Sequence, residues 1–194
     1  MTPMALLIMD VQQGIVERFA RDDGYLDRLA TAIAAARSAG IMVTYVTIGF
    51  RPGYPEVSER NKGFSAVAGT GRFTGSDPGV GIPAVIAPEP GEVTVTKRRV
   101  SAFTGSDLEV LLRARAIHHL VLAGIATSGV MLSTLRQAAD LDYQLTVLSD
   151  GCLDADPDVH QILLDKVFPR QAEVTTVADW AARLNAAPTS ADGH

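Results

Sequence analysis

The stretch "HLVLAGIATSGVMLSTLRQAADLDYQLTVLSD", residues 119–150, decides the fold. Residues 119–125 are an almost continuous apolar run, which predicts a strand buried on both faces, and residues 144–150 predict another. Between them, residues about 128–141 have the pattern of a helix. Two apolar strands joined by one helix are typical of a parallel sheet whose faces are covered by helices. The stretch therefore predicts an α/β fold.

The same alternation of apolar strands and helical patterns continues on both sides of this unit. Further strands are expected at residues 5–10, 41–48, 92–97 and 173–177, and further helices at 23–39, 106–117, 156–168 and 178–186. Together they predict a three-layer αβα sandwich around a six-stranded parallel sheet, a Rossmann-like arrangement. We expect one domain over residues 1–186 and a disordered tail over residues 187–194.

The composition is that of an ordinary globular enzyme. A chain of 194 residues can bury roughly 70% of its unfolded surface in one domain. The formal net charge of −5 gives no electrostatic reason to bind nucleic acid or an anionic membrane. No apolar run reaches the roughly 20 residues that span a bilayer, and the N-terminus lacks the basic region of a signal peptide. We therefore expect a cytoplasmic protein that acts on a small molecule.

The cysteine and histidine patterns argue against a disulfide, a metal site or a bound cofactor. Cys152 is the single cysteine, so no internal disulfide can form. The sequence has no C-x-x-C, no H-E-x-x-H and no histidine cluster. His118 and His119 precede a strand and are expected at the surface, whereas His160 lies in a predicted helix and is expected to make a structural hydrogen bond. We expect neither metal nor cofactor.

Several polar residues follow the carboxyl ends of predicted strands, where ligands bind in open parallel sheets. Asp10 ends the first strand, Lys97 the third and Asp150 the fifth, while Ala126 and Thr127 follow the fourth. A second feature of this edge is the Gly- and Pro-rich region 49–91. Irregular segments of that length are usually functional, so it is a candidate lid or subunit contact.

Asp10 and Lys97 each allow a structural and a chemical interpretation. A carboxylate at the end of an apolar strand can be an ion-pair or capping residue, because an unpaired buried charge is costly. It can also be a general acid or base whose pKa is set by burial and a nearby cation. Lys97 is the natural cation, although "TKRR" can also be a short basic run that faces water. Cys152 follows the fifth strand and is either a packing group or a nucleophile.

Three motifs carry a family resemblance. "ALLIMDVQQGIV" resembles the opening strand of the isochorismatase-like hydrolases, also called the cysteine hydrolase superfamily. "EVTVTKRRVSAFTGSDLEVLLRARAI" is similar to their second motif. "HLVLAGIATSGVMLSTLRQAADLDYQLTVLSDGC" is similar to the third, in which a G-x-x-T turn leads into the nucleophile helix. The resemblance extends from residue 5 to about residue 180, with the motifs in the family's order.

The resemblance implies the family's fold, commonly a homodimer or larger homo-oligomer, and a site built on an Asp, a Lys and a Cys. Matched by motif, the Asp is Asp10 and the Lys is Lys97. The non-proline cis peptide bond that family members carry before the motif's Thr would join Ala126 to Thr127. In most members the cysteine attacks an amide carbonyl and forms a thioester.

This chain departs from the family pattern at the nucleophile. Three residues beyond Thr127, where the family has its cysteine, stands Val130, whose side chain cannot act as a nucleophile. Ser128 does not replace it, because two residues correspond to about 200° around a helix. The isochorismatases proper also lack the thiol and use their Asp as a general acid, with water as the nucleophile. They carry Tyr-Ala-His where this chain has Ala126, Thr127 and Ser128.

Our leading hypothesis is a hydrolase that uses Asp10 for general acid–base catalysis, with Lys97 as its electrostatic partner and water as the nucleophile. Gln12, Ala126 and Thr127 are candidate substrate contacts, and the apolar pocket walls are expected from Phe103, Val130 and either Phe19 or Phe50. One alternative is an inactive family member that binds a small molecule or serves as an oligomeric interaction protein. A further alternative is an amidase that uses Cys152.

Overall fold

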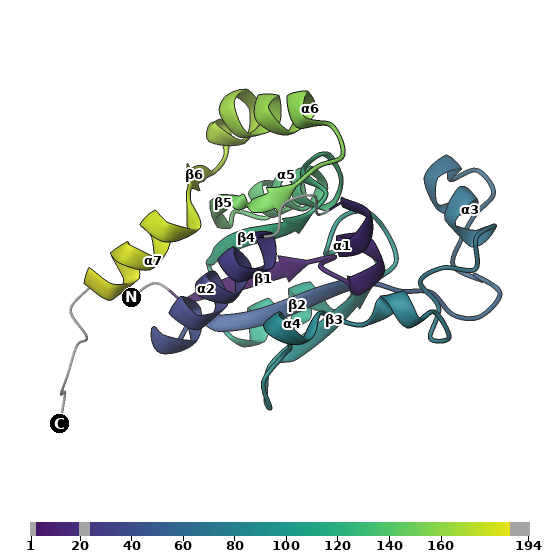
Figure 1. Cartoon of the computed structure of the whole chain (residues 1–194), viewed down its shortest axis with the longest axis horizontal. Helices are drawn as coiled ribbons and strands as arrows, with labels where there is room; N and C mark the ends of the chain where they lie inside the picture. Colours follow the sequence, from purple (N-terminus) through teal and green to yellow (C-terminus); the bar gives the residue numbers. More distant parts are fainter. Residues whose placement is uncertain (1–2, 20–23, 187–194) are drawn as a thin grey trace.

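The computed structural model describes residues 3–19 and 24–186 of the chain, and its centre is a six-stranded parallel sheet (Figure 1). The strand order is β3-β2-β1-β4-β5-β6, and every neighbouring pair runs parallel. The strands are β1 (Met4–Met9), β2 (Met42–Ile48), β3 (Val93–Lys97), β4 (His119–Ile125), β5 (Gln144–Leu153) and β6 (Glu173–Thr175). The predicted six-stranded parallel sheet is confirmed.

Helices cover both faces of the sheet and give the predicted three layers (Figure 1). The α-helices are α1 (Gln13–Phe19), α2 (Tyr25–Ser38), α3 (Lys62–Ala68), α4 (Leu108–Ala114), α5 (Leu132–Asp140), α6 (Pro157–Ile162) and α7 (Val177–Ala186). The short 3-10 and π segments are η1 (Pro78–Val80), η2 (Ala84–Ile86), η3 (Thr127–Met131), η4 (Leu163–Val167) and η5 (Phe168–Arg170). Core residues of α4, α5 and η4 pack on one face, and those of α1, α2 and α7 pack on the other.

The central strands explain why their sequences are continuously apolar. In β1, Leu7 and Met9 belong to the core on the α5 side, whereas Leu6 and Ile8 belong to the core on the α2 side. Successive side chains of a strand point to opposite faces, so a strand covered on both faces must be apolar throughout. The first charged residue after β1, Asp10, is therefore held at the edge of two hydrophobic cores.

The fifth strand is longer than predicted. The sequence predicted its end at Asp150, but β5 continues to Leu153, so Asp150 and Cys152 lie within the strand. Pairing with β4 extends to Ile125 opposite Leu153, and the register shifts between Leu122 and Gly124. This irregularity lets β5 stay paired through a segment whose Asp and Gly are typical of a turn.

One further prediction is wrong, and two short helices were not predicted. His119 was expected at the surface but is buried, because β4 pairs with β1 and β5 at this residue, and its Nε2 lies 2.9 Å from Oγ1 of Thr146. The short helices α1 and α3 were not predicted, and α3 stands away from the sheet with no buried residue (Figure 1). The tail 187–194 lies outside the described residues. In the described part of the chain, every helix is too short or too polar to cross a bilayer.

Candidate active site

Asp10 is the first residue after β1 and has a left-handed backbone conformation, with φ of 56°. Aspartate tolerates this conformation better than most residues. Its backbone N–H donates to the carbonyl oxygen of Val46 in β2 at 2.8 Å, which fixes the turn against the neighbouring strand. The carboxylate is therefore held at the carboxyl edge of the sheet, as the sequence predicted.

Lys97 brings the complementary charge from β3, across the intervening strand β2. It is the last residue of β3 and its side chain is only 2% exposed. Its Nζ lies 2.9 Å from Oδ2 of Asp10 and donates a hydrogen bond to the carbonyl oxygen of Arg99, also at 2.9 Å. The structure thus brings together the two residues that the sequence singled out, as a buried ion pair.

Burial dominates the acidity of Asp10. It raises the pKa of this carboxyl to about 6, against the lowering effects of the Lys97 charge and of the hydrogen bond from Lys97. Oδ2 faces the ammonium group, whereas Oδ1 is buried and has no hydrogen-bond partner among the described residues. A proton on this carboxyl would therefore reside on Oδ1, because Oδ2 already accepts a hydrogen bond from Lys97.

The turn after β4 contains a cis peptide bond, one residue earlier than expected. The resemblance placed it between Ala126 and Thr127, but it joins Ile125 to Ala126. The cis bond directly follows β4, which ends at Ile125. The half-buried Ala126 then accepts hydrogen bonds at its carbonyl from the amides of Gly129 and Met131. The turn is closed by its own backbone.

Thr127 is fully buried and its hydroxyl is already used within the fold. Its Oγ1 donates to the carbonyl oxygen of Leu153 at 3.1 Å and lies 2.7 Å from Nδ1 of His160. A hydroxyl has one proton to donate, so His160 donates its Nδ1 proton to Thr127. This contact joins α6 to the turn and agrees with the structural role predicted for His160.

Val130 and Phe103 lie in the hydrophobic core on the α5 side, together with Met9 of β1. Val130 is part of η3, where the chain passes from the turn into α5, and it is 2% exposed. An aliphatic side chain occupies the position that the resemblance assigns to the nucleophile.

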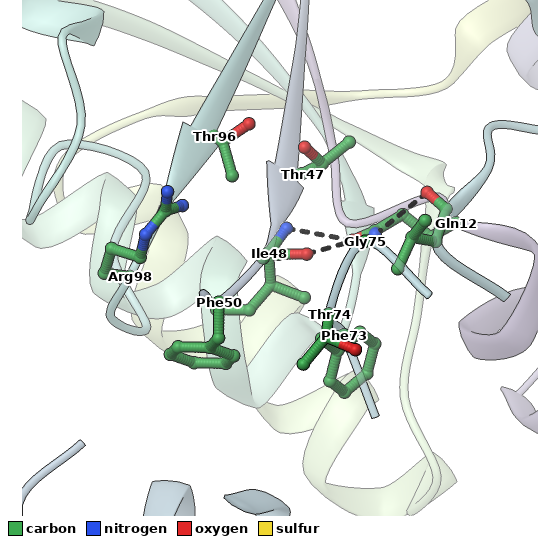
Figure 2. Close-up of a pocket in the computed structure, with 11 residues that line it drawn as sticks. Gln12, Thr47, Ile48, Phe50, Phe73, Thr74, Gly75, Thr96 and Arg98 are labelled. Carbon is green, nitrogen blue, oxygen red and sulfur yellow. Dashed lines mark hydrogen bonds between the residues drawn. The ribbon is translucent and has the colours of Figure 1, made fainter. Parts of the chain in front are cut away.

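Gln12 lines a cavity of about 250 Å³ (Figure 2). Its amide is committed to the backbone, because Nε2 donates to the carbonyl oxygens of Ile48 and Val80, both at 3.1 Å, and Oε1 accepts from Ile48 N at 2.9 Å. Of the two aromatic residues proposed as alternatives, Phe50 lines this cavity and Phe19 does not. Asp10 and Lys97 are not among the lining residues.

Cys152 is placed as a packing group. It lies within β5, is buried, and its Sγ donates to the carbonyl oxygen of Leu148 at 3.1 Å. Burial raises the pKa of the thiol to about 12, so the reactive thiolate is scarce near neutral pH.

Two contributors to the site were missed. Asp154 accepts the backbone N–H of Ser128 at 2.7 Å and so supports the turn, and the carbonyl of Arg99 anchors Lys97. The acidic run "DADPD" after the fifth strand was a usable signal for Asp154, because it follows the correct edge of the sheet. A backbone carbonyl has no signal in the sequence.

Over residues 3–19 and 24–186, no group of three or more His, Cys, Asp or Glu side chains could hold a metal ion.

Comparisons with known proteins show the family of this chain. The isochorismatase domain model matches residues 4–179. Ureidoacrylate amidohydrolase RutB of Enterobacter sp. (strain 638) is 30% identical, with 91% of this chain and 86% of that protein covered. The isochorismatase family protein YwoC of Bacillus subtilis (strain 168) is 31% identical, with 93% of each chain covered.

Solved structures share the fold. An isochorismatase family protein from Burkholderia thailandensis superposes with a TM-score of 0.81 at 30% identity, covering 94% of this chain and 96% of that one. A cysteine hydrolase from Pseudomonas syringae pv. phaseolicola 1448A reaches a TM-score of 0.85 at 24% identity, covering 96% and 94%, and it shows likeness of fold alone.

Proposed function

This chain belongs to the isochorismatase family of hydrolases, and from that premise we propose that it hydrolyses a small molecule by general acid–base catalysis at Asp10, with water as the nucleophile. The observation that carries the proposal is the state of the Asp10 carboxyl. One oxygen is paired with Lys97, and the other is buried without a partner. A buried carboxyl with a pKa of about 6 can hold a proton at neutral pH and release it to a bound substrate.

The chemical step follows from the two oxygens. Asp10 transfers its Oδ1 proton to the substrate, and water adds to the carbon that this leaves electron-poor. The bond between that carbon and the leaving group breaks, and the transferred proton ends in the products. A proton from that water returns to Asp10, so the hydrolysis is balanced and the carboxyl is regenerated. While Asp10 is ionised, the ammonium of Lys97 at 2.9 Å stabilises the carboxylate. The role of Lys97 is therefore to stabilise the ionised form of Asp10.

Val130 supports water, and not a protein side chain, as the nucleophile. It stands where the family resemblance places the cysteine, and its side chain has no lone pair. The thiol of Cys152 is buried with a raised pKa, and the hydroxyl of Thr127 donates to Leu153. We therefore assign no covalent intermediate to the reaction.

A screen of amides, vinyl ethers and esters tests the proposal. Ureidoacrylate belongs in the panel because relatives of this chain are named for its hydrolysis. We expect turnover of at least one compound, with oxygen from ¹⁸O-labelled water appearing in the product and no covalent adduct in the mass spectrum of the protein. A covalent adduct on any residue would contradict water as the nucleophile.

The rival is a non-catalytic family member that binds a small molecule or serves as an oligomeric interaction protein. Two observations favour it: the aliphatic Val130, and the polar atoms of Gln12 and Thr127, which are used inside the fold. Tight binding of a compound without turnover of any member of the panel would support this rival over the hydrolase.

The remaining proposals concern the setting of the activity. We propose a homodimer or larger homo-oligomer on the strength of the family resemblance, and a cytoplasmic location from the single cysteine and the lack of signal-peptide and membrane-span patterns in the sequence. Light scattering coupled to size-exclusion chromatography tests the assembly, and a single-chain mass at working concentrations would overturn it.

A further inference from the structure

The cavity of about 250 Å³ lies at the carboxyl ends of β2 and β3, and its lining combines polar and apolar side chains (Figure 2). Thr47 and Thr96 stand at the ends of the two strands, with Arg98 beside them, and the rings of Phe50 and Phe73 lie on the other side of Ile48 (Figure 2). A few placed polar groups in a mainly apolar pocket are typical of small-molecule sites.

The apolar side is built from aromatic rings that are fixed by the fold. Phe50 is buried, and its ring centroid lies 5.6 Å from those of both Tyr54 and Phe64. Its backbone N–H donates to the carbonyl oxygen of Phe73 at 2.7 Å, which holds the two aromatic residues together. The cavity therefore offers a preformed surface for a flat apolar group.

Arg98 supplies the only charged side chain of the lining. Its Nη1 donates to the carbonyl oxygen of Lys97 at 3.3 Å, and its Nε lies 3.4 Å from Oε1 of Glu56. Within the described residues, its Nη2 makes no hydrogen bond. The guanidinium is thus anchored at one edge and keeps donors for an anion in the cavity.

The nearby carboxylate of Glu56 does not neutralise Arg98 by itself. The same Oε1 atom of Glu56 also accepts a hydrogen bond from Arg51, so two guanidinium groups share one carboxylate. The net charge of these three side chains is therefore positive. An anionic group in the cavity would compensate it, whereas a cation would be repelled.

We propose that this cavity binds small carboxylic acids that carry a flat apolar body, with the carboxylate on Arg98 and the body against Phe50 and Phe73. The guanidinium fork matches the geometry of a carboxylate, and the hydroxyls of Thr47 and Thr96 stand on the same side. The site is separate from the Asp10–Lys97 pair, because neither residue lines the cavity. Its existence does not depend on the proposed hydrolysis.

Isothermal titration with benzoate tests the site, with benzamide and acetate as probes that lack the charge and the apolar body. We expect benzoate to bind more tightly than both, and Arg98→Met to weaken it about tenfold or more, as for loss of a charge-assisted hydrogen bond. Arg60→Met removes the same charge from an exposed residue outside the cavity and should bind benzoate like the unmodified protein.

Two further variants separate this site from the ion pair and guard against misfolding. In the double variant Asp10→Asn, Lys97→Met both buried charges are removed together, and benzoate binding should be unchanged. Thr96→Val alters an exposed residue and should weaken benzoate a few-fold without unfolding the chain. Absence of binding up to about 10 mM benzoate, unchanged binding by Arg98→Met, or loss of binding by a double variant that circular dichroism shows to be folded would each overturn the proposal.

Discussion

The Nζ atom of Lys97 lies 2.9 Å from Oδ2 of Asp10, although Lys97 ends β3, Asp10 directly follows β1, and β2 separates these two strands in the sheet. The pair is almost completely buried, so each charge depends on the other for stabilisation. Burial still prevails over the cation and raises the pKa of Asp10. The raised pKa of Asp10 and its Oδ1 atom, which has no hydrogen-bond partner among the described residues, are the basis of the proposed chemistry.

The pH dependence of turnover follows from that pKa. If Asp10 acts as the acid, the free enzyme must be protonated, so kcat/KM should be constant below about pH 6 and fall about tenfold per pH unit above it. Initial rates between pH 5 and pH 8 measure this. A rate that instead rises through pH 6 would make Asp10 a general base, and a flat profile would remove it from the proton transfer.

Lys97→Met should destabilise the fold more as the pH rises. Without the ammonium, burial acts unopposed and the pKa of Asp10 rises further above its unfolded value of 3.8. A raised folded pKa gives stability that is complete at low pH and is lost as pH rises through it. The native protein loses this contribution by about pH 6, and the variant continues to lose it above pH 6 at about 1.4 kcal/mol per pH unit.

Urea unfolding at pH 5 and pH 8 tests this dependence. We expect a small difference between the native protein and Lys97→Met at pH 5 and a loss of about 3 kcal/mol at pH 8. Lys166→Met, at an exposed lysine, is the matched control and should behave like the native protein. An equal loss at both pH values would mean that Lys97 contributes packing without electrostatic coupling to Asp10.

Cys152 should be dispensable for turnover. The thiol is buried in β5 and its pKa is raised to about 12, so iodoacetamide should leave the folded protein unlabelled and active. Cys152→Ala should retain full kcat, with a loss of stability of about 1–2 kcal/mol from the buried volume. Loss of turnover in a folded Cys152→Ala protein would restore the amidase alternative.

Gly124 should be indispensable for the position of Asp10. Its φ of +150° is one that L side chains rarely adopt, and a Cβ there would lie 2.1 Å from the carbonyl oxygen of Met9, the residue before Asp10. Gly124→Ala should therefore cost about 3 kcal/mol or more in the free energy of unfolding and lower turnover.

Gly81→Ala is the control for Gly124→Ala. Gly81 has no positive φ, and an added Cβ would meet nothing within 4 Å. Thermal unfolding of both variants tests the comparison, and Gly124→Ala should melt at the lower temperature. Equal melting temperatures would show that β1 and β4 can move apart without a loss of stability.

Much of the fold could be predicted, because the apolar pattern of buried parallel strands is strong. Five of the six strands end within two residues of the prediction. The exception is β5, where Asp150 and Gly151 are typical of a turn, but pairing with the irregular end of β4 keeps the chain extended. The helices α1 and α3 were missed because each has only seven residues, too short for a clear period.

The site was predictable only where chain topology decides position. Asp10 directly follows one strand and Lys97 ends another at the same edge of a parallel sheet, so their approach follows from the fold. The hydrogen bonds that occupy Gln12 and Thr127 depend on backbone atoms distant in sequence, which no local pattern encodes. Arg98 was interpreted as part of a basic run that faces water, yet it follows the end of β3 and its side chain lines a cavity.

The most direct test of the account is the turnover of Asp10→Asn beside the matched control Asp158→Asn, which removes an exposed carboxylate. Asparagine keeps the shape of the side chain but has no acidic proton. With a substrate from the hydrolase screen, Asp10→Asn should lower kcat by about 10²-fold or more while the control remains unaffected. Full turnover by a folded Asp10→Asn protein would contradict the proposed role of the carboxyl.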